Sequence, residues 1–98
     1  MYPKNTPWGQ TQHAEKLARG IYMLTTAGHG GIYLDGSRQL EIGKRSKWLD
    51  SAAFWEEDCD WAVPVAFFKS AILRHNPDME KSIKAAENQI KNDPEYYS

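Results

Sequence analysis

Cysteine is almost absent from this sequence. Cys59 is the only cysteine among 98 residues, which excludes an intramolecular disulfide and, with it, the disulfide-dense class of small secreted domains. A reducing compartment is the simpler expectation for a chain of this kind. We therefore expect a cytoplasmic protein.

Long hydrophobic runs are missing as well. The longest apolar stretch, residues 61–68, is far shorter than the roughly 20 residues of a membrane-spanning helix. The opening segment, MYPKNTP, holds no apolar core of the kind that signal peptides need. We expect a soluble protein that is neither targeted to a membrane nor anchored in one.

Neither sign of charge is in excess. Twelve basic and thirteen acidic residues give a formal net charge of -1, so no long-range field draws the chain toward nucleic acid or anionic lipid. Residues 44–47 (KRSK) and the following Trp48 form one basic patch beside an aromatic ring, which could contact phosphate and stack on a base. A solvated loop is the simpler interpretation, so nucleic-acid binding through residues 44–48 is kept as a minor alternative.

Large apolar side chains, by contrast, are plentiful. The chain is 41% hydrophobic and holds four Trp, five Tyr and three Phe. A chain of this length buries about two thirds of its unfolded surface, which suffices for one hydrophobic core. The sequence therefore predicts a single domain over residues 1–98.

The first part of the chain predicts a small sheet. Pro3 and Pro7 disfavour helix, so residues 1–9 are expected to form an extended arm. Residues 11–35 are rich in β-branched and aromatic side chains and predict a three-stranded antiparallel meander, although residues 11–19 also fit a helical face. Three glycines are expected to provide the backbone angles of its second turn: Gly28, Gly30 and Gly31.

The second half of the chain predicts two helices. Apolar residues spaced by four, three and four positions indicate a helix over about residues 61–74, and they are Trp61, Val65, Phe68 and Ile72. Asn76 as a cap and Pro77 at the first helical position mark the start of the second helix. A helical hairpin over residues 61–92 follows, packed on the sheet, and the predicted fold class is α+β with a three-stranded antiparallel sheet and two C-terminal helices.

The last helix is also predicted from its charge pattern. Glu80 with Lys84, and Glu87 with Lys91, are favourable pairs four residues apart. Pro94 stops the run, so the tail at residues 93–98 is expected to fray.

Reactive side chains are densest in residues 54–61, FWEEDCDW. Crowded carboxylates repel one another, which raises the pKa of any that are buried and suits them to general acid or base chemistry. The simpler interpretation is structural, because acidic residues stabilise the N-terminus of a following helix.

A second cluster lies in residues 25–31, TTAGHGG. Its backbone amides could form an anion-binding nest and His29 could titrate near neutral pH, but a hairpin turn explains the same residues. Together the two clusters give the candidate catalytic residues: His29, Glu57, Asp58 and Cys59.

Two specific site chemistries are compatible with the residue types in these clusters. Cys59 with His29 could form a thiolate and its base, although the neighbouring carboxylates oppose thiolate formation. His13 and His29 with Glu57 or Asp58 are suitable metal ligands, but their spacing matches no known site. We assign no metal and no cofactor from the sequence.

The order and spacing of several segments resemble an uncharacterised domain found in proteins of bacteriophages, plasmids and other mobile elements. The segments that carry the resemblance are Pro7-Trp8-Gly9, Gln12-His13, Gly20-Ile21, residues 26–32 (TAGHGGI), residues 55–62 (WEEDCDWA) and Asn76-Pro77-Asp78. The resemblance implies no reaction and no catalytic residue. It does imply a mobile-element accessory protein, and such proteins often bind host machinery, including immune systems.

The leading hypothesis is therefore a non-catalytic protein that binds a bacterial host protein, such as a CRISPR or other antiviral defence component, in the host cytoplasm. Inhibition of that host protein is one outcome that such binding could have. Aromatic side chains dominate binding hot spots, and the expected anchors are Tyr22, Tyr33, Trp48 and Trp55. A homodimer is compatible with the sequence. The main alternative is a small enzyme or ligand-binding domain that uses His29 with Glu57, Asp58 or Cys59.

Overall fold

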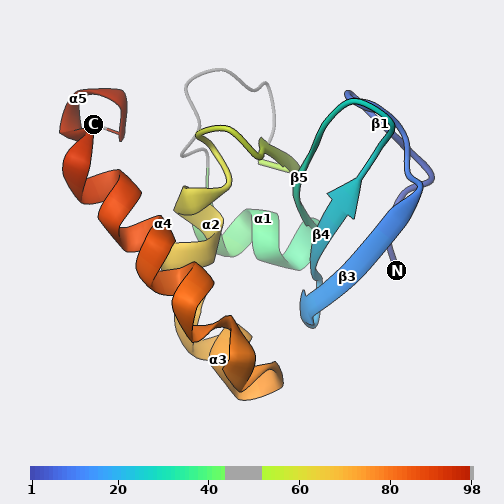
Figure 1. Cartoon of the computed structure of the whole chain (residues 1–98). Helices are drawn as coiled ribbons and strands as arrows, with labels where there is room; N and C mark the ends of the chain where they lie inside the picture. The colour runs from blue at the N-terminus through green and yellow to red at the C-terminus, as the bar shows by residue number, and fades with distance from the viewer. Residues whose placement is uncertain (44–51, 98) are drawn as a thin grey trace.

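A computed structural model of the whole chain describes residues 1–43 and 52–97. Helices and strands occur together, which confirms the α+β class (Figure 1). The strands are β1 (Asn5–Thr6), β2 (Gly9–Gln10), β3 (His13–Ala18), β4 (Ile21–Thr25), β5 (Gly30–Leu34) and β6 (Phe54–Glu56). The helices are α1 (Gly36–Ile42), α2 (Ala62–Phe67), α3 (Lys69–His75), the short 3-10 turn η1 (Pro77–Met79), α4 (Glu80–Asn92) and α5 (Pro94–Tyr97).

The main sheet has four antiparallel strands in the order β3-β4-β5-β6, so the expectation of three strands is wrong. The additional strand is β6, in the segment that was expected to lead into a helix. Trp55 pairs with Ile32 of β5, and the backbone amide of Leu34 donates to the carbonyl of Ala53 at 2.9 Å. Three residues are too few for the alternation of apolar and polar side chains to distinguish a strand from the start of a helix.

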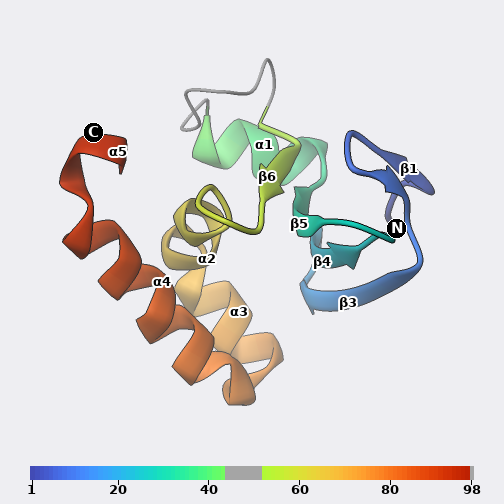
Figure 2. The same cartoon turned by 45° about the horizontal axis from the view of Figure 1, so that its top comes forward.

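The core lies between one face of this sheet and the helices (Figure 2). From the sheet it takes side chains on alternating positions, including Ile21, Ile32, Leu34 and Trp55. From the helices it takes the predicted apolar stripes, of which Val65, Phe68, Ile72, Ile83 and Ala86 are buried. Burial of these apolar side chains is the main favourable term for the fold.

The opposite face of the sheet is covered by the N-terminal segment. Residues 1–9 do not form an extended arm, because β1 pairs with β2 as an antiparallel ribbon that folds back on the sheet (Figure 2). The Trp8 ring packs edge-on against Phe54 with centroids 5.7 Å apart, and the hydroxyl of Thr26 donates to the Trp8 carbonyl at 3.2 Å. Trp8 is thus the side chain that fastens the ribbon.

Two of the three hairpin glycines, Gly30 and Gly31, are needed for close approach rather than for unusual backbone angles. Among the described residues, a positive φ occurs at Gly9, Gly20 and Gly43 and at none of the hairpin glycines. A side chain on Gly31 would strike the Trp55 carbonyl oxygen and the Trp8 ring, and one on Gly30 would meet the Leu24 carbonyl oxygen at 2.6 Å. The turn itself is closed by Thr26, whose backbone amide and hydroxyl both donate to the His29 carbonyl, at 2.8 and 2.7 Å.

The predicted helix over residues 61–74 is two helices, α2 and α3, separated at Phe68 (φ -99°, ψ 24°). Hydrogen bonds continue across the break, since Phe68 donates to the Pro64 carbonyl at 2.9 Å and its own carbonyl accepts from Ile72 at 3.0 Å. The apolar stripe therefore keeps its register on both sides.

The Asn76 cap forms as predicted, but it caps a 3-10 turn, and the last α-helix begins only at Glu80. The side-chain oxygen of Asn76 accepts from the Asp78 amide at 3.1 Å, and α4 follows the 3-10 turn η1. The pair Glu80–Lys84 forms at 3.3 Å, whereas the carboxylate of Glu87 contacts Lys69 of α3 at 3.2 Å instead of the expected Lys91. A tertiary ion pair thus replaces a local one.

The tail does not fray. Residues Pro94–Tyr97 form α5, and the Tyr97 hydroxyl donates to the Cys59 carbonyl at 2.7 Å while the Tyr96 hydroxyl donates to Asp60 at 2.6 Å. The docking site is the turn between β6 and α2, which the sequence could not place beside the tail. In the described part of the chain, no helix has the length and hydropathy to cross a membrane.

Candidate functional site

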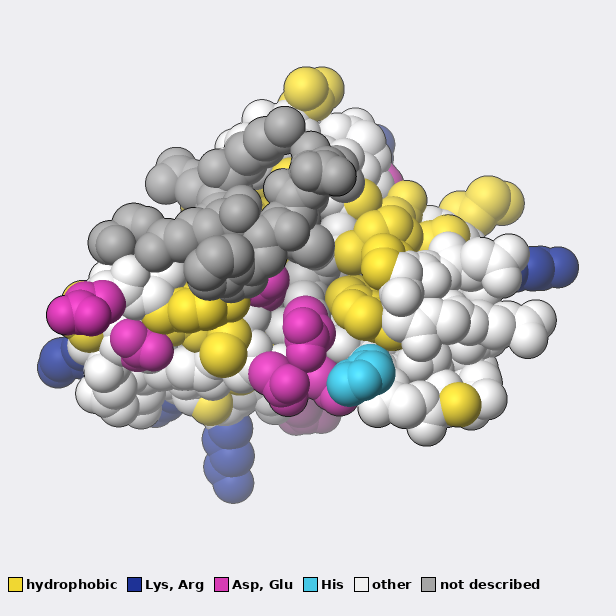
Figure 3. Space-filling model, turned by 90° about the horizontal axis from the view of Figure 1, so that it is seen from above, with side chains coloured by type: hydrophobic (Ala, Val, Ile, Leu, Met, Phe, Trp, Pro, Cys, Tyr) yellow, Lys and Arg dark blue, Asp and Glu magenta, His cyan; other side chains and the backbone are white. Residues whose placement is uncertain are grey.

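The two reactive clusters of the sequence lie side by side at one end of the sheet. Gly31 of β5 pairs with Glu56 of β6, and the Glu57 amide donates to the Gly30 carbonyl at 3.0 Å. Figure 3 shows carboxylates gathered beside a histidine side chain on this face. The antiparallel pairing of β5 with β6 is therefore what brings His29 to the acidic segment.

Glu56 is the carboxyl with the most perturbed environment at this end. Burial raises its pKa above the ordinary 4.5, the hydrogen bond that protonated Glu56 donates to the Asp58 side chain and the Asp58 charge raise it further, and His29 lowers it. A hydrogen-bonded carboxyl pair retains a proton more readily than an isolated carboxyl. Glu56 was not among the candidate residues, although its position two residues after Phe54 places both on one strand face.

Glu57 points elsewhere. A carboxylate oxygen of Glu57 lies 3.2 Å from the position that a Cβ on Gly30 would take. Glu57 is exposed and follows the end of β6. The carboxyl pair that forms is Glu56 with Asp58.

Cys59 is held in an environment that disfavours its thiolate. Burial raises the pKa of the thiol, and the charges of Asp60, Asp58, Asp93 and Glu56 raise it further. Since the thiolate is the nucleophilic form, a raised pKa reduces reactivity at neutral pH. The backbone carbonyl of Cys59 accepts from Tyr97, so this residue receives the docked tail.

The candidate metal ligands are not assembled. Within residues 1–43 and 52–97, no three His, Cys, Asp or Glu side chains are placed to hold one metal ion. His13 pairs with Thr25 at the start of β3, while His29 lies in the hairpin turn beside Glu56. The set of His13, His29 and Glu57 or Asp58 therefore does not form a site.

The expected partner anchors have different positions. Trp55 is fully buried and its indole nitrogen donates to the Ala52 carbonyl at 2.7 Å, so it is a core residue and the expectation that it contacts a partner is wrong. Tyr22 is 8% exposed, and its hydroxyl accepts from the Met1 amino group at 2.5 Å. The N-terminal segment thus already occupies Tyr22, whereas Trp48 and the basic loop at 44–47 lie outside the described residues.

Tyr33 is half-buried and belongs to a row of aromatic rings on the ribbon-covered face. Its ring centroid lies 5.4 Å from that of Phe54 and 6.5 Å from that of Tyr22. Trp8 continues the row beyond Phe54. Three half-buried rings of this row, those of Trp8, Tyr33 and Phe54, adjoin the carboxyl pair of Glu56 and Asp58. We call these five residues the acidic-aromatic surface.

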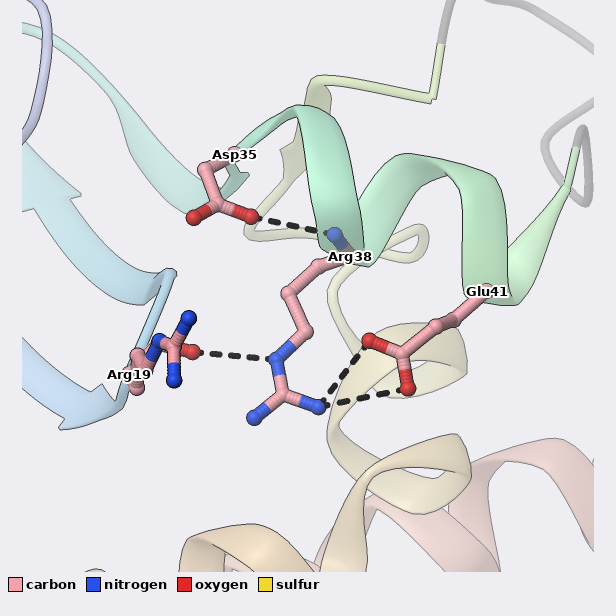
Figure 4. A network of polar contacts seen from close by, with 4 residues as sticks. All are labelled: Arg19, Asp35, Arg38 and Glu41. Atoms are coloured by element: carbon pink, nitrogen blue, oxygen red, sulfur yellow. Dashed lines mark hydrogen bonds and ion pairs between the residues drawn. The ribbon is translucent and has the colours of Figure 1, made fainter.

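A second site lies among the helices and was missed by sequence reasoning. A hollow of about 530 Å³ is lined by three arginines, one histidine and two alanines, and we call it the arginine groove: Ala18, Arg19, Arg38, Ala71, Arg74 and His75. Figure 4 shows the Arg38 guanidinium between the Arg19 carbonyl and the Glu41 carboxylate. The arginines are far apart in the sequence, so no spacing could have grouped them.

A comparison with protein-family models assigns the chain to a family. A family model described as a domain of unknown function (DUF7007) matches residues 1–98. The chain belongs to the DUF7007 family. The chain matched no curated protein and no solved structure.

Membership in DUF7007 confirms the resemblance to an uncharacterised domain. It transfers no role to any residue, because the family carries no assigned function. The two surfaces described above are therefore the candidate functional sites of this DUF7007 domain.

Proposed function

We propose that this chain is a non-catalytic binding protein that contacts a partner protein through the acidic-aromatic surface. The supporting observation is the half-buried row of Tyr33, Phe54 and Trp8, which adjoins the Glu56–Asp58 carboxyl pair. Aromatic rings supply a large contact area at low conformational cost.

The partner's contact surface carries arginine or lysine. Carboxylates at the edge of an interface favour cationic groups on the other side, and a guanidinium also stacks on an aromatic ring. Charge complementarity of this kind speeds association and selects the partner. Following the resemblance to mobile-element domains, we propose a bacterial host protein as the partner, including components of CRISPR or other antiviral defence.

The same contacts favour binding over catalysis. The raised pKa of the Cys59 thiol disfavours its use as a nucleophile. The Glu56–Asp58 pair has His29 beside it as a base, and the described residues hold no group of three metal ligands. A binding surface needs only the shape and charge that these side chains supply.

The test is an affinity capture from bacterial host lysate with the tagged full chain. Wild type is expected to retain one host protein in stoichiometric amount, with binding that weakens as salt rises. The double variant Glu56→Lys/Asp58→Lys is expected to lose it, because the cations repel a basic partner surface.

The matched control is Glu15→Lys/Glu80→Lys, which makes the same charge change at exposed positions on β3 and α4. It is expected to retain the partner. Circular dichroism establishes that both variants are folded. Capture of no stoichiometric protein, or equal loss in both double variants, would refute the proposal.

A further inference from the structure

The arginine groove gathers positive charge from three separate parts of the chain. Arg19 lies in the turn after β3, Arg38 in α1 and Arg74 in the last turn of α3. The groove has no carboxylate among its lining residues. Glu41 pairs with Arg38, so Arg19 and Arg74 supply the excess positive charge that attracts an anion to the groove.

Arg38 is held in a fixed orientation. Its Nε donates to the Arg19 carbonyl at 2.9 Å, and one terminal nitrogen contacts the Glu41 carboxylate at 3.2 Å. Its guanidinium carbon lies 5.1 Å from the centroid of the Phe68 ring, and the side chain is only 19% exposed. A guanidinium carries five N–H donors, so the other terminal nitrogen keeps two for a ligand at little further entropic cost.

The backbone around Arg38 reinforces this orientation. Asp35 caps α1 by accepting from the Arg38 amide at 3.0 Å, and the Asp35 amide donates to the Gly20 carbonyl at 2.9 Å. Gly20 adopts φ +76°, with the Asp35 carboxylate filling the space that a side chain would take. The turn that carries Arg19 is thus tied to the start of α1.

Arg19 and Arg74 complete the charge of the groove. Both are exposed, and neither forms an ion pair with any residue in the described ranges. Arg74 also lies where a cation stabilises a helix C-terminus. That structural role explains Arg74 and His75 but not the convergence of Arg19 and Arg38 on the same hollow.

The groove also has apolar walls. Ala18 and Ala71 form part of its lining. An adjoining hollow of about 240 Å³ shares Arg38, Ala71 and Arg74 with it and adds Phe67, Phe68, Ser70 and Glu41. Phe67 is 47% exposed. The 530 Å³ of the arginine groove lies within the range of small-molecule sites, whereas the adjoining hollow is smaller than that range.

We propose that the arginine groove binds a small organic phosphate, with the phosphate held by the three guanidiniums and its apolar body against Ala71 and Phe67. Guanidinium groups match the oxygens of phosphate in forked hydrogen bonds, and a phosphate dianion offsets more of the groove's charge than a single carboxylate does. This site shares no residue with the acidic-aromatic surface, so it stands or falls separately from the proposed function.

The test is a nuclear magnetic resonance titration of the ¹⁵N-labelled full chain with phenyl phosphate and, separately, inorganic phosphate. Phenyl phosphate is expected to shift the signals of the arginine groove and to bind several-fold more tightly than inorganic phosphate. Arg19→Gln and Arg74→Gln are each expected to lower the affinity for phenyl phosphate about five- to tenfold, because each removes one charge-assisted contact. Both sites are exposed, so the fold is expected to persist.

Lys84→Gln is the matched control, because it removes one exposed cation outside the groove. It is expected to change affinity less than twofold. The proposal is overturned if millimolar phenyl phosphate shifts no groove signal, if Lys84→Gln weakens binding as much as the arginine variants, or if inorganic phosphate binds equally well. Binding of a single-stranded oligonucleotide without binding of phenyl phosphate would overturn it too.

Discussion

At the scale of single residues, the hairpin between β4 and β5 holds two glycines with different surroundings. A Cβ on Gly28 would meet nothing within 4 Å, whereas one on Gly31 would strike the Trp55 carbonyl oxygen and lie 2.6 Å from a carbon of the Trp8 ring. Gly31 is paired on both sides, to Leu24 and Glu56, so its backbone has little freedom to move away. Gly28 has open space instead.

We predict that Gly31→Ala lowers the free energy of unfolding by about 2–3 kcal/mol, the cost typical of an overpacked site. Gly28→Ala is expected to change it by less than about 0.5 kcal/mol. Urea unfolding followed by Trp fluorescence measures both. Equal destabilisation by the two variants would show that the turn, and not the contact with Trp8 and Trp55, is the sensitive feature.

The carboxyl pair of Glu56 and Asp58 has a pH-dependent consequence at the same scale. The pKa of Glu56 is raised on folding, first by burial and then by Asp58. The folded state therefore binds the proton more tightly than the unfolded state, which disfavours folding once the group is ionised at neutral pH. This cost is absent below the ordinary carboxyl pKa and develops as pH rises through the raised value.

Glu56→Gln is accordingly predicted to be more stable than wild type at pH 7 and equal to it near pH 3. Thermal melts across this pH range measure the difference. Glu57→Gln, at the exposed neighbouring position, serves as the control and is expected to follow wild type. A stability gain that is constant from pH 3 to pH 7 would contradict the titration argument.

At the scale of elements, α5 is a short helix that depends on its contacts. The Tyr97 hydroxyl donates to the Cys59 carbonyl and accepts from the Gln89 side chain, each at 2.7 Å. Four residues are too few for a helix to be stable by itself. The first hydrogen bond therefore joins the end of the described chain to the turn that precedes α2, and the second joins it to α4.

Tyr97→Phe is predicted to destabilise the protein by about 1 kcal/mol, which is the usual net value of a lost hydrogen bond. Amide exchange is expected to quicken at residues 94–97 first. Tyr2→Phe is the matched control, since Tyr2 is 44% exposed and its hydroxyl bonds to no described residue. Unchanged exchange in Tyr97→Phe would mean that ring packing alone holds α5.

At the scale of the whole molecule, the sheet separates two surfaces of different chemistry. The N-terminal ribbon and the acidic-aromatic surface lie on one face, and the helices that line much of the arginine groove pack on the other (Figure 2). Exposed charges separated by more than about 8 Å are largely screened at physiological salt. The two surfaces can thus bind different ligands in one chain.

This separation predicts that the two binding activities are lost independently. The double variant Arg19→Gln/Arg74→Gln is expected to weaken the binding of phenyl phosphate and to leave partner capture unchanged. Glu56→Lys/Asp58→Lys is expected to have the opposite effect. Parallel capture and titration on the same purified variants check this, and a variant that loses both activities while folded would indicate one shared site.

Local patterns predicted much of the fold. The β-branched and aromatic run predicted β4 and β5, and the spacing of Val65, Phe68 and Ile72 predicted a helical stripe that is buried. Asn76 predicted the start of the last helix, because a cap acts within one turn. Each of these features is decided by residues close together in the chain.

Contacts between distant residues were decided only by the tertiary structure. Phe54–Glu56 becomes a strand because β5 offers a free edge, and Trp8 covers Gly31 because the ribbon folds back. Arg19, Arg38 and Arg74 share one groove through the packing of α1 and α3 near the end of β3. By itself, then, the sequence determined the α+β class, the strands β4 and β5 and the apolar stripes of the C-terminal helices, through short-range propensity and periodicity. The site residues depend on which elements pack together, and that choice follows from burial summed over the whole core.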